Sequence, residues 1–276
     1  MSIDAALARV LTGLVVSAAN PAPPLLAPDE PTAFEVLEDR TRSPFLITCD
    51  HAGRRLPRAL GNLGLSEAEL ERHIAWDLGA AGVARGLARG LGAFAALQPY
   101  SRLVIDCNRP PGVPSSIAEV SENTAIIGNR ALSPAEAERR RVAVFEPYHQ
   151  CIAQELARRA RAGQPTVLIA MHSFTPRFDG VARPWHVGLL YNRDTRLAHA
   201  LLPLLRKDPE LVVGDNEPYA VSDLSDYGVV EYGERLGHPH VEIEVRQDLL
   251  SDERGQAEWA ERFRALLPAA CRAFQP

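Results

Sequence analysis

The sequence predicts a three-layer α/β/α fold whose central sheet is mixed but mostly parallel. Short apolar runs with strand character alternate along the chain with amphipathic helical patterns, as they do in α/β proteins. Several of these runs, such as 166–171, are apolar at nearly every position, which is typical of strands covered on both faces. The 276 residues contain no internal repeat or interior linker, so one large domain is the simplest organisation.

The elements follow a proline-rich start. A short helix or arm over 11–19 ends at the Pro21–Pro24 cluster, and we assign residues 1–43 to an N-terminal arm and lead-in and 44–276 to the single α/β domain. The predicted strands cover 45–49, 102–107, 166–171, 186–191, 211–213 and 240–245. The predicted helices cover 66–91, opened by a Ser66–Glu69 capping box, 133–162, kinked at Pro147, 195–205 and 255–273.

Composition excludes several classes of protein. The formal net charge of −5 lacks the basic footprint of nucleic-acid binding. The uncharged apolar runs are well under the ~20 residues that span a bilayer, so we expect no membrane partner. The four cysteines form no CxxC pair and fit reduced thiols in a cytoplasmic protein. The run 11–19 could pass for a weak signal peptide, but Asp4 precedes it and lysine is absent there.

Polar residues follow the predicted strands at their carboxyl ends, where sites form in open α/β sheets. These are Asp50-His51, Asn108-Arg109, His172-Ser173 and the run 192–194. His51 and His172 lie beyond two apolar strands, so the two imidazoles can converge on one cation, although a histidine at a strand end can also simply cap a loop. A catalytic zinc needs three protein ligands and one open position.

Asp77 is the candidate for the third ligand. It lies close to the buried stripe of the predicted 66–91 helix, and a carboxylate there needs a partner because unpaired buried charge is costly. The partner could instead be an arginine. His73, four residues earlier, is an alternative ligand or a group that orients Asp77.

The predicted strand over 240–245 carries two glutamates on one face. Period-two alternation places Glu242 and Glu244 on one side and Val241, Ile243 and Val245 on the other. An edge strand with one solvated face would explain this pattern. Alternatively, one glutamate enters the site as the base that takes a proton from the attacking water of a metal hydrolase. We favour Glu244 because it lies nearer the end of the strand.

Two arginines, Arg102 and Arg109, lie in or just after the predicted strand over 102–107. Arg109 offers a planar fork suited to a carboxylate, and Asn108 could orient an amide or carbonyl of a substrate. Arg102 could serve in the same way. The structural alternative is that Arg102 pairs with Asp106, because both would point to the same face of an extended strand, while Arg109 is exposed to solvent.

Five motifs in series resemble the N-formylglutamate amidohydrolase family over roughly 44–250. They are Asp50-His51-Ala-Gly, His73-Ile-Ala-Trp-Asp77, Arg102 to Asp106-Cys-Asn108-Arg109, His172-Ser-Phe-Thr-Pro176 and His240-Val-Glu-Ile-Glu244. The resemblance implies a phosphorylase/hydrolase-like fold related to zinc carboxypeptidases and aspartoacylases. It also implies a Zn²⁺-dependent hydrolase of small N-formyl or N-acyl amino acids such as N-formylglutamate. Carried over by position, His51, Asp77 and His172 would bind zinc, Glu244 would be the general base, and Arg109 with Asn108, or Arg102, would hold a small-molecule carboxylate substrate.

Two positions depart from the expected patterns. Arg54 stands where zinc carboxypeptidases have a glutamate, and Tyr232 lies where we would expect a histidine. The second departure motivates an alternative function, a non-catalytic small-molecule binding protein on a hydrolase scaffold. A third alternative is a cysteine-nucleophile amidase that uses Cys49 with His51, or Cys107 with a distant histidine. The sequence specifies no oligomeric state.

Overall fold

The computed structural model describes residues 24–37 and 43–274, so the helix or arm expected at 11–19 lies outside it. A seven-stranded sheet in the order β1-β3-β2-β6-β11-β9-β10 forms the centre of the domain. Its strands are β1 (Glu35–Leu37), β2 (Phe45–Cys49), β3 (Phe94–Leu97), β6 (Val167–Phe174), β9 (Val187–Leu190), β10 (Val213–Asp215) and β11 (His240–Arg246). Two short hairpins lie outside the sheet: β4 (Val120–Ser121) with β5 (Thr124–Ala125), and β7 (Arg177–Phe178) with β8 (Val181–Ala182).

The sheet is mixed and mostly parallel, as predicted. Strands β3, β2, β6 and β11 run parallel to one another. Strand β9 is antiparallel to β11, and β10 runs parallel to β9. Strand β1, which belongs to the predicted lead-in, adds an antiparallel edge to β3. The carboxyl ends of β2, β6 and β11 therefore meet at one edge of the sheet, whereas β9 ends at the opposite edge.

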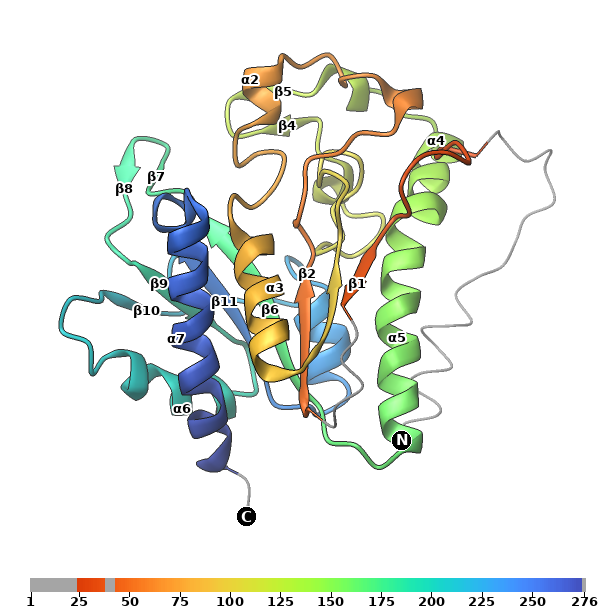
Figure 1. Ribbon diagram of the computed structural model, residues 1–276. Helices are drawn as coiled ribbons and strands as arrows, with labels where there is room; N and C mark the ends of the chain where they lie inside the picture. Colours follow the sequence, from red (N-terminus) through yellow and green to blue (C-terminus); the bar gives the residue numbers. More distant parts are fainter. Residues whose placement is uncertain (1–23, 38–42, 275–276) are drawn as a thin grey trace.

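Helices cover both faces of the sheet. The α-helices are α2 (Glu67–Leu70), α3 (Ala80–Leu91), α4 (Pro134–Arg140), α5 (Glu146–Arg161), α6 (Arg196–Leu205) and α7 (Glu253–Arg272). Figure 1 shows α3, α6 and α7 on one side of the sheet and α5 on the other. Val241, Ile243 and Val245 of β11 pack in the core beneath α3, α6 and α7, while Leu46 and Leu168 pack with the α5 side. No helix among the described residues is long and apolar enough to cross a membrane.

Shorter helical segments complete the chain. The 3-10 helices are η1 (Arg58–Leu60), η2 (Pro114–Ile117), η3 (Ile127–Asn129) and η6 (Gln247–Leu250), and the π-helical segments are η4 (Arg141–Phe145) and η5 (Val229–Glu234). The predicted helix over 133–162 therefore forms as α4, η4 and α5 in succession. Pro147 lies in the first turn of α5, where its missing N–H removes no bond within that helix, and the π segment precedes it.

The predicted helix over 66–91 is wrong in its middle. It ends at Leu70, and α3 begins only at Ala80. The backbone between them bonds to other loops: Asp77 N donates to His51 O at 3.0 Å, and Arg102 N donates to Ala75 O at 3.2 Å. Gly79 then starts α3 at φ +76°, a conformation that favours glycine. Tertiary hydrogen bonds thus replace the helical ones and place Asp77 in a loop.

The predicted strand over 102–107 is also wrong. That segment forms turns, and the strand beside β2 is β3, eight residues earlier in the chain. The apolar run 103–105 is buried as expected, but its side chains divide between two core clusters instead of pairing in the sheet. The Ala-rich sequence of β3 has little intrinsic strand preference, which explains why the apolar run that follows it looked like the better strand.

Arg140 anchors this irregular region to α4. Its side chain is buried, and its guanidinium donates to Val104 O at 3.1 Å, Asn129 Oδ1 at 2.7 Å and Gly128 O at 3.1 Å. We expect Arg140→Met to lower the free energy of unfolding by about 2–4 kcal/mol, because buried acceptors lose charged donors. Urea unfolding measures this change, with Arg139→Met as the matched control. Equal stabilities of the two variants would contradict the anchoring role.

Candidate metal and hydrolase site

A cavity of about 530 Å³ opens at the edge of the sheet where β2, β6 and β11 end. Three of the four predicted strand-end groups contribute to it, through His51, Asn108, Arg109 and His172. The fourth, 192–194, follows β9 and belongs to the opposite edge, because β9 is antiparallel to β11. The sheet topology therefore explains why the groups of His51 and His172 reach the site and 192–194 does not, whereas Asn108 and Arg109 reach it from a turn segment.

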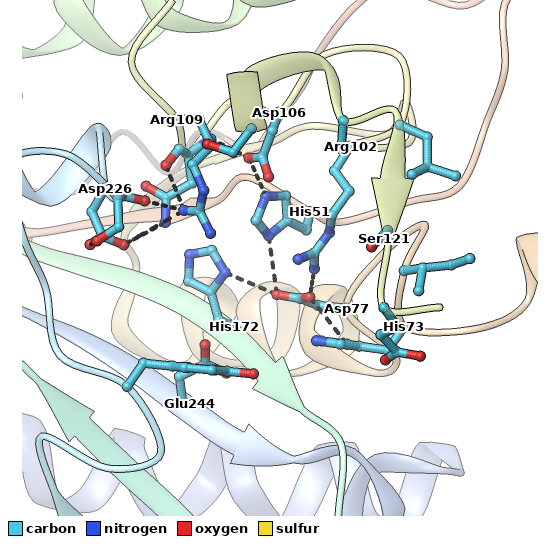
Figure 2. A pocket seen from close by; sticks show the side chains of 18 of the residues that line it. His51, His73, Asp77, Arg102, Asp106, Arg109, Ser121, His172, Asp226 and Glu244 are labelled. Atoms are coloured by element: carbon cyan, nitrogen blue, oxygen red, sulfur yellow. Dashed lines mark hydrogen bonds and ion pairs between the residues drawn. The ribbon is translucent and has the colours of Figure 1, made fainter. Parts of the chain in front are cut away.

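His51, Asp77 and His172 lie together in this cavity (Figure 2). Asp77 Oδ2 is 3.4 Å from His51 Nδ1 and 2.9 Å from His172 Nδ1, and all three side chains are buried. One candidate ligand atom from each residue lies within 4.8 Å of the others. Atoms bound about 2.0–2.1 Å from a tetrahedral zinc are roughly 3.3 Å apart. The spacing and the donor set therefore fit a zinc ion.

Each imidazole has a second carboxylate on its outer nitrogen. His51 Nε2 contacts Asp106 Oδ1 at 2.7 Å, and His172 Nε2 lies 3.4 Å from Asp50 Oδ2. The Tyr148 hydroxyl donates to the other oxygen of Asp50 at 2.6 Å. Metal-binding histidines commonly use such carboxylates to fix the tautomer and orient the ring. Neither role was predicted, although Asp50 and Asp106 belong to the motifs that contain His51 and Arg109.

The loops that carry the ligand candidates are joined through their backbones. Asp77 N donates to His51 O, which links the loop before α3 to the loop after β2. The loop after β2 also packs closely against Pro99, because a Cβ on Gly53 would lie 2.3 Å from Pro99 O. A side chain at position 53 would thus push the His51 loop away from its neighbour.

Asp77 also makes the alternative contact that the sequence allowed, a salt bridge with arginine. Its Oδ1 pairs with Arg102 Nη2, and His73 Nδ1 lies 3.5 Å from the same oxygen. The other oxygen, Oδ2, faces the two imidazoles. The ion pair and the cluster therefore use different oxygens, so the ion pair orients Asp77 without occupying the oxygen that faces the cluster.

Negative charge predominates in the cavity. It is lined by two guanidiniums, Arg102 and Arg109, and by the carboxylates of Asp77, Asp106, Glu122, Asp226, Glu242 and Glu244. Burial raises the pKa of Glu244 to about 7. Burial would lower the pKa of His172, but Glu242, Asp50 and Glu244 outweigh it and raise that pKa to about 10. A bound cation would balance this excess of carboxylates.

Both glutamates of β11 face the cavity. Glu244 is in register with His172 on the neighbouring parallel strand β6, so the two side chains leave the same face of the sheet. Strand β11 lies between β6 and β9, and Glu242 and Glu244 are 3% and 6% exposed. The alternative of an edge strand with one solvated face is therefore wrong, and the period-two assignment of the two faces is confirmed.

Comparison with known proteins identifies the family. The model for N-formylglutamate amidohydrolase matches residues 43–251. The chain belongs to the N-formylglutamate amidohydrolase family. It is 30% identical over 262 residues to the N-formylglutamate deformylase of Pseudomonas aeruginosa, an alignment that covers 87% of this chain and 94% of that protein.

Two crystal structures of similar proteins support the fold. A gene product of Agrobacterium tumefaciens superposes with a TM-score of 0.88 at 35% identity, covering 91% of this chain and 100% of that one. The N-formylglutamate amidohydrolase of Ralstonia eutropha JMP134 has a TM-score of 0.62 at 18% identity, covering 87% and 98%. The second likeness concerns the fold alone.

In this family member, the groups predicted to bind substrate are partly used by the chain itself. Asn108 Nδ2 donates to Asp226 Oδ1 at 3.3 Å, and its Oδ1 accepts from Tyr227 N at 3.1 Å. Arg109 donates to Asn108 O and to Ser225 O and lies 3.9 Å from Asp226. Both residues line the cavity. The predicted ion pair of Arg102 with Asp106 is replaced by Arg102–Asp77 and Asp106–His51 contacts.

The sequence departures and the thiols lie away from the cavity lining. Tyr232 is buried, and its hydroxyl contacts His149 Nδ1 at 2.8 Å. Arg54 pairs with Glu67 at the surface. Cys49 and Cys107 are buried in the core clusters on opposite faces of the sheet, and burial raises the pKa of Cys49 to about 12. Neither thiol is among the described residues that line the cavity, so the cysteine-nucleophile alternative has no support from the site.

Proposed function

We propose that this family member is a zinc-dependent amidohydrolase that cleaves the linear amide bond of a small N-formyl or N-acyl amino acid. The observation that carries this proposal is the buried His51–Asp77–His172 cluster, which shares one cavity with Glu244. The name of the Pseudomonas aeruginosa relative supports an N-formylglutamate-like substrate. The arginines of the cavity supply the positive charge that such a carboxylate needs.

His51, Asp77 and His172 would hold the zinc. When bound, this ion polarises the scissile carbonyl and lowers the pKa of water. Asp106 bonds Nε2 of His51 at 2.7 Å and would orient that ring, and Asp50 lies 3.4 Å from Nε2 of His172, where it would stabilise a proton on that nitrogen. Arg102 holds Asp77 by its other oxygen. These contacts orient the cluster before substrate arrives.

Glu244 would move the proton. It accepts a proton from the attacking water while the water oxygen bonds to the acyl carbon. The carbon–nitrogen bond then breaks, and Glu244 returns the proton to the leaving nitrogen, so the products are a carboxylate and a free amino acid. A pKa of about 7, raised by burial, suits a group that must both take and return a proton near neutral pH.

Arg109 would bind the carboxylate of the amino acid. Its side chain is 27% exposed, and charge-assisted pairing with a carboxylate is the strongest contact it can offer. Asn108 would act as a positioning residue, because its amide group bonds the Asp226 carboxylate and the Tyr227 backbone N–H beside Arg109. Arg109 and Glu244 line the same cavity, which supports these two roles.

The decisive experiment is an assay of the zinc-loaded protein with N-formyl-L-glutamate. We expect formate and glutamate in equal amounts, loss of turnover on complete chelation, and recovery when zinc is restored. Turnover that persists after complete chelation would contradict the metal mechanism. Ligand-dependent thermal stabilisation without product would favour the alternative of a binding protein. That alternative rested on Tyr232, which does not contribute to the cavity lining.

A further inference from the structure

The two sides of the cavity differ in how many apolar side chains they carry. Figure 2 shows Arg109 and Asp226 on one side of the His51–Asp77–His172 cluster, and His73 and Ser121 on the other. The lining residues that contact Arg109 are polar: Asn108, Ser225 and Asp226. The lining from the segments of His73, Arg102 and Ser121 carries apolar side chains beside these polar ones: Ile74, Leu103, Ala118 and Val120. The cluster therefore lies between two chemically different surfaces.

Exposed apolar side chains gather at the mouth of this cavity. The described residues include eight exposed large apolar side chains, and three of them line this cavity: Val120, Phe178 and Tyr219, at 57%, 40% and 38% exposure. Isolated apolar residues on a surface are ordinary, but several at one cavity mark a binding surface. Val120 and Phe178 belong to the hairpins β4–β5 and β7–β8, which are separate in the sequence.

Arg183 holds two of these rings in place. Its guanidinium lies 4.7 Å from the ring centroids of both Phe178 and Tyr219, and it donates to the Tyr219 hydroxyl at 2.8 Å. These contacts with Arg183 thus hold the two rings at the cavity.

We infer that the preferred substrate carries an apolar acyl group of several carbons, bound between Val120 and Phe178; this inference rests on the proposed function. With its carboxylate at Arg109 and its amide at the cluster, an N-acyl amino acid directs the acyl group toward the side that carries Ile74, Leu103, Ala118 and Val120. A formyl group bears only hydrogen on the carbonyl carbon and covers none of these side chains. The volume of about 530 Å³ falls in the range of pockets that enclose larger ligands.

The test compares kcat/KM for N-acetyl-, N-butanoyl- and N-hexanoyl-L-glutamate, whose amides have similar intrinsic reactivity. We expect kcat/KM to rise by about fourfold per added methylene as apolar surface is buried. The hexanoyl-to-acetyl ratio should fall at least tenfold in the double variant Val120→Ser, Phe178→Ser. Val212→Ser is the matched control, because Val212 is exposed at 45% but does not line the cavity.

The ratio is measured within each variant, so partial loss of folded protein does not affect it. A wild-type ratio near or below one, or a ratio unchanged in the double variant, overturns the inference. Hydrolysis of N-formyl-L-glutamate with no gain for longer acyl groups overturns the inference alone. Failure to hydrolyse any of these compounds overturns the proposed function and this inference with it.

Discussion

Glu244→Gln should lower kcat by about 10²–10⁴-fold, the usual contribution of a general base, and leave the bound zinc in place. Glutamine has nearly the same shape and cannot accept the proton of the attacking water. Glu244 lies on β11 beside His172, outside the His51–Asp77–His172 cluster, so the substitution removes no ligand. The measurement is steady-state kinetics on protein whose zinc content is determined in the same sample.

Glu242→Gln is the matched control for this variant. Glu242 lies on the same face of β11, is also buried, lines the same cavity and has a pKa raised by burial to about 7. We expect its kcat to remain within about tenfold of wild type, because the residue is further from the carboxyl end of the strand. A large loss in Glu242→Gln with a small one in Glu244→Gln would transfer the role of base to Glu242.

His172→Asn should reduce zinc from about one ion per chain to a trace and abolish turnover. The imidazole contributes Nδ1 to the cluster, opposite Asp77 Oδ2 at 2.9 Å, and two remaining ligands are too few for a catalytic zinc site. Because a metal that binds only the native state stabilises it, zinc should also raise the melting temperature of the wild type and not of this variant. Elemental analysis and thermal melts measure the two effects.

His149→Asn provides the control for removing a buried imidazole. His149 is 3% exposed and contacts the Tyr232 hydroxyl and Cys107 O, but it does not line the cavity. This variant should lose stability and keep its zinc. Full zinc retention by His172→Asn would remove His172 from the ligand set, whatever happens to its activity.

The architecture was predictable because long apolar runs and clear helix caps determine it. Strands β6 and β11 and helices α6 and α7 form close to the expected ranges. The period-two pattern of β11 correctly separated its glutamate face from its valine face. The same alternation could not reveal that β11 is interior, because a polar face can meet either solvent or a buried site. That distinction depends on strand order, which is a property of the whole chain.

The loops of the site were harder to predict. Asp77 was expected on a helix face, but it lies in a loop whose backbone bonds to residues 51 and 102. The expected grouping of His51, Asp77 and His172 still occurs, although the reasoning that placed Asp77 beside a helical stripe used the wrong geometry. Turn segments such as 101–109 form through tertiary hydrogen bonds between distant loops, and a local pattern in one sequence carries little information about such bonds.

The cavity-lining residues lie partly in the central sheet and partly on the two small hairpins, and this has an evolutionary consequence. His172 and Glu244 lie within central strands, where a change in backbone would disturb the core, whereas Val120 and Phe178 lie on short external hairpins. Hairpins of this kind tolerate substitution and length change far better than interior strands. If the hairpins set the acyl preference, as we infer, substitutions there can change that preference between related proteins while the residues of the central strands stay the same.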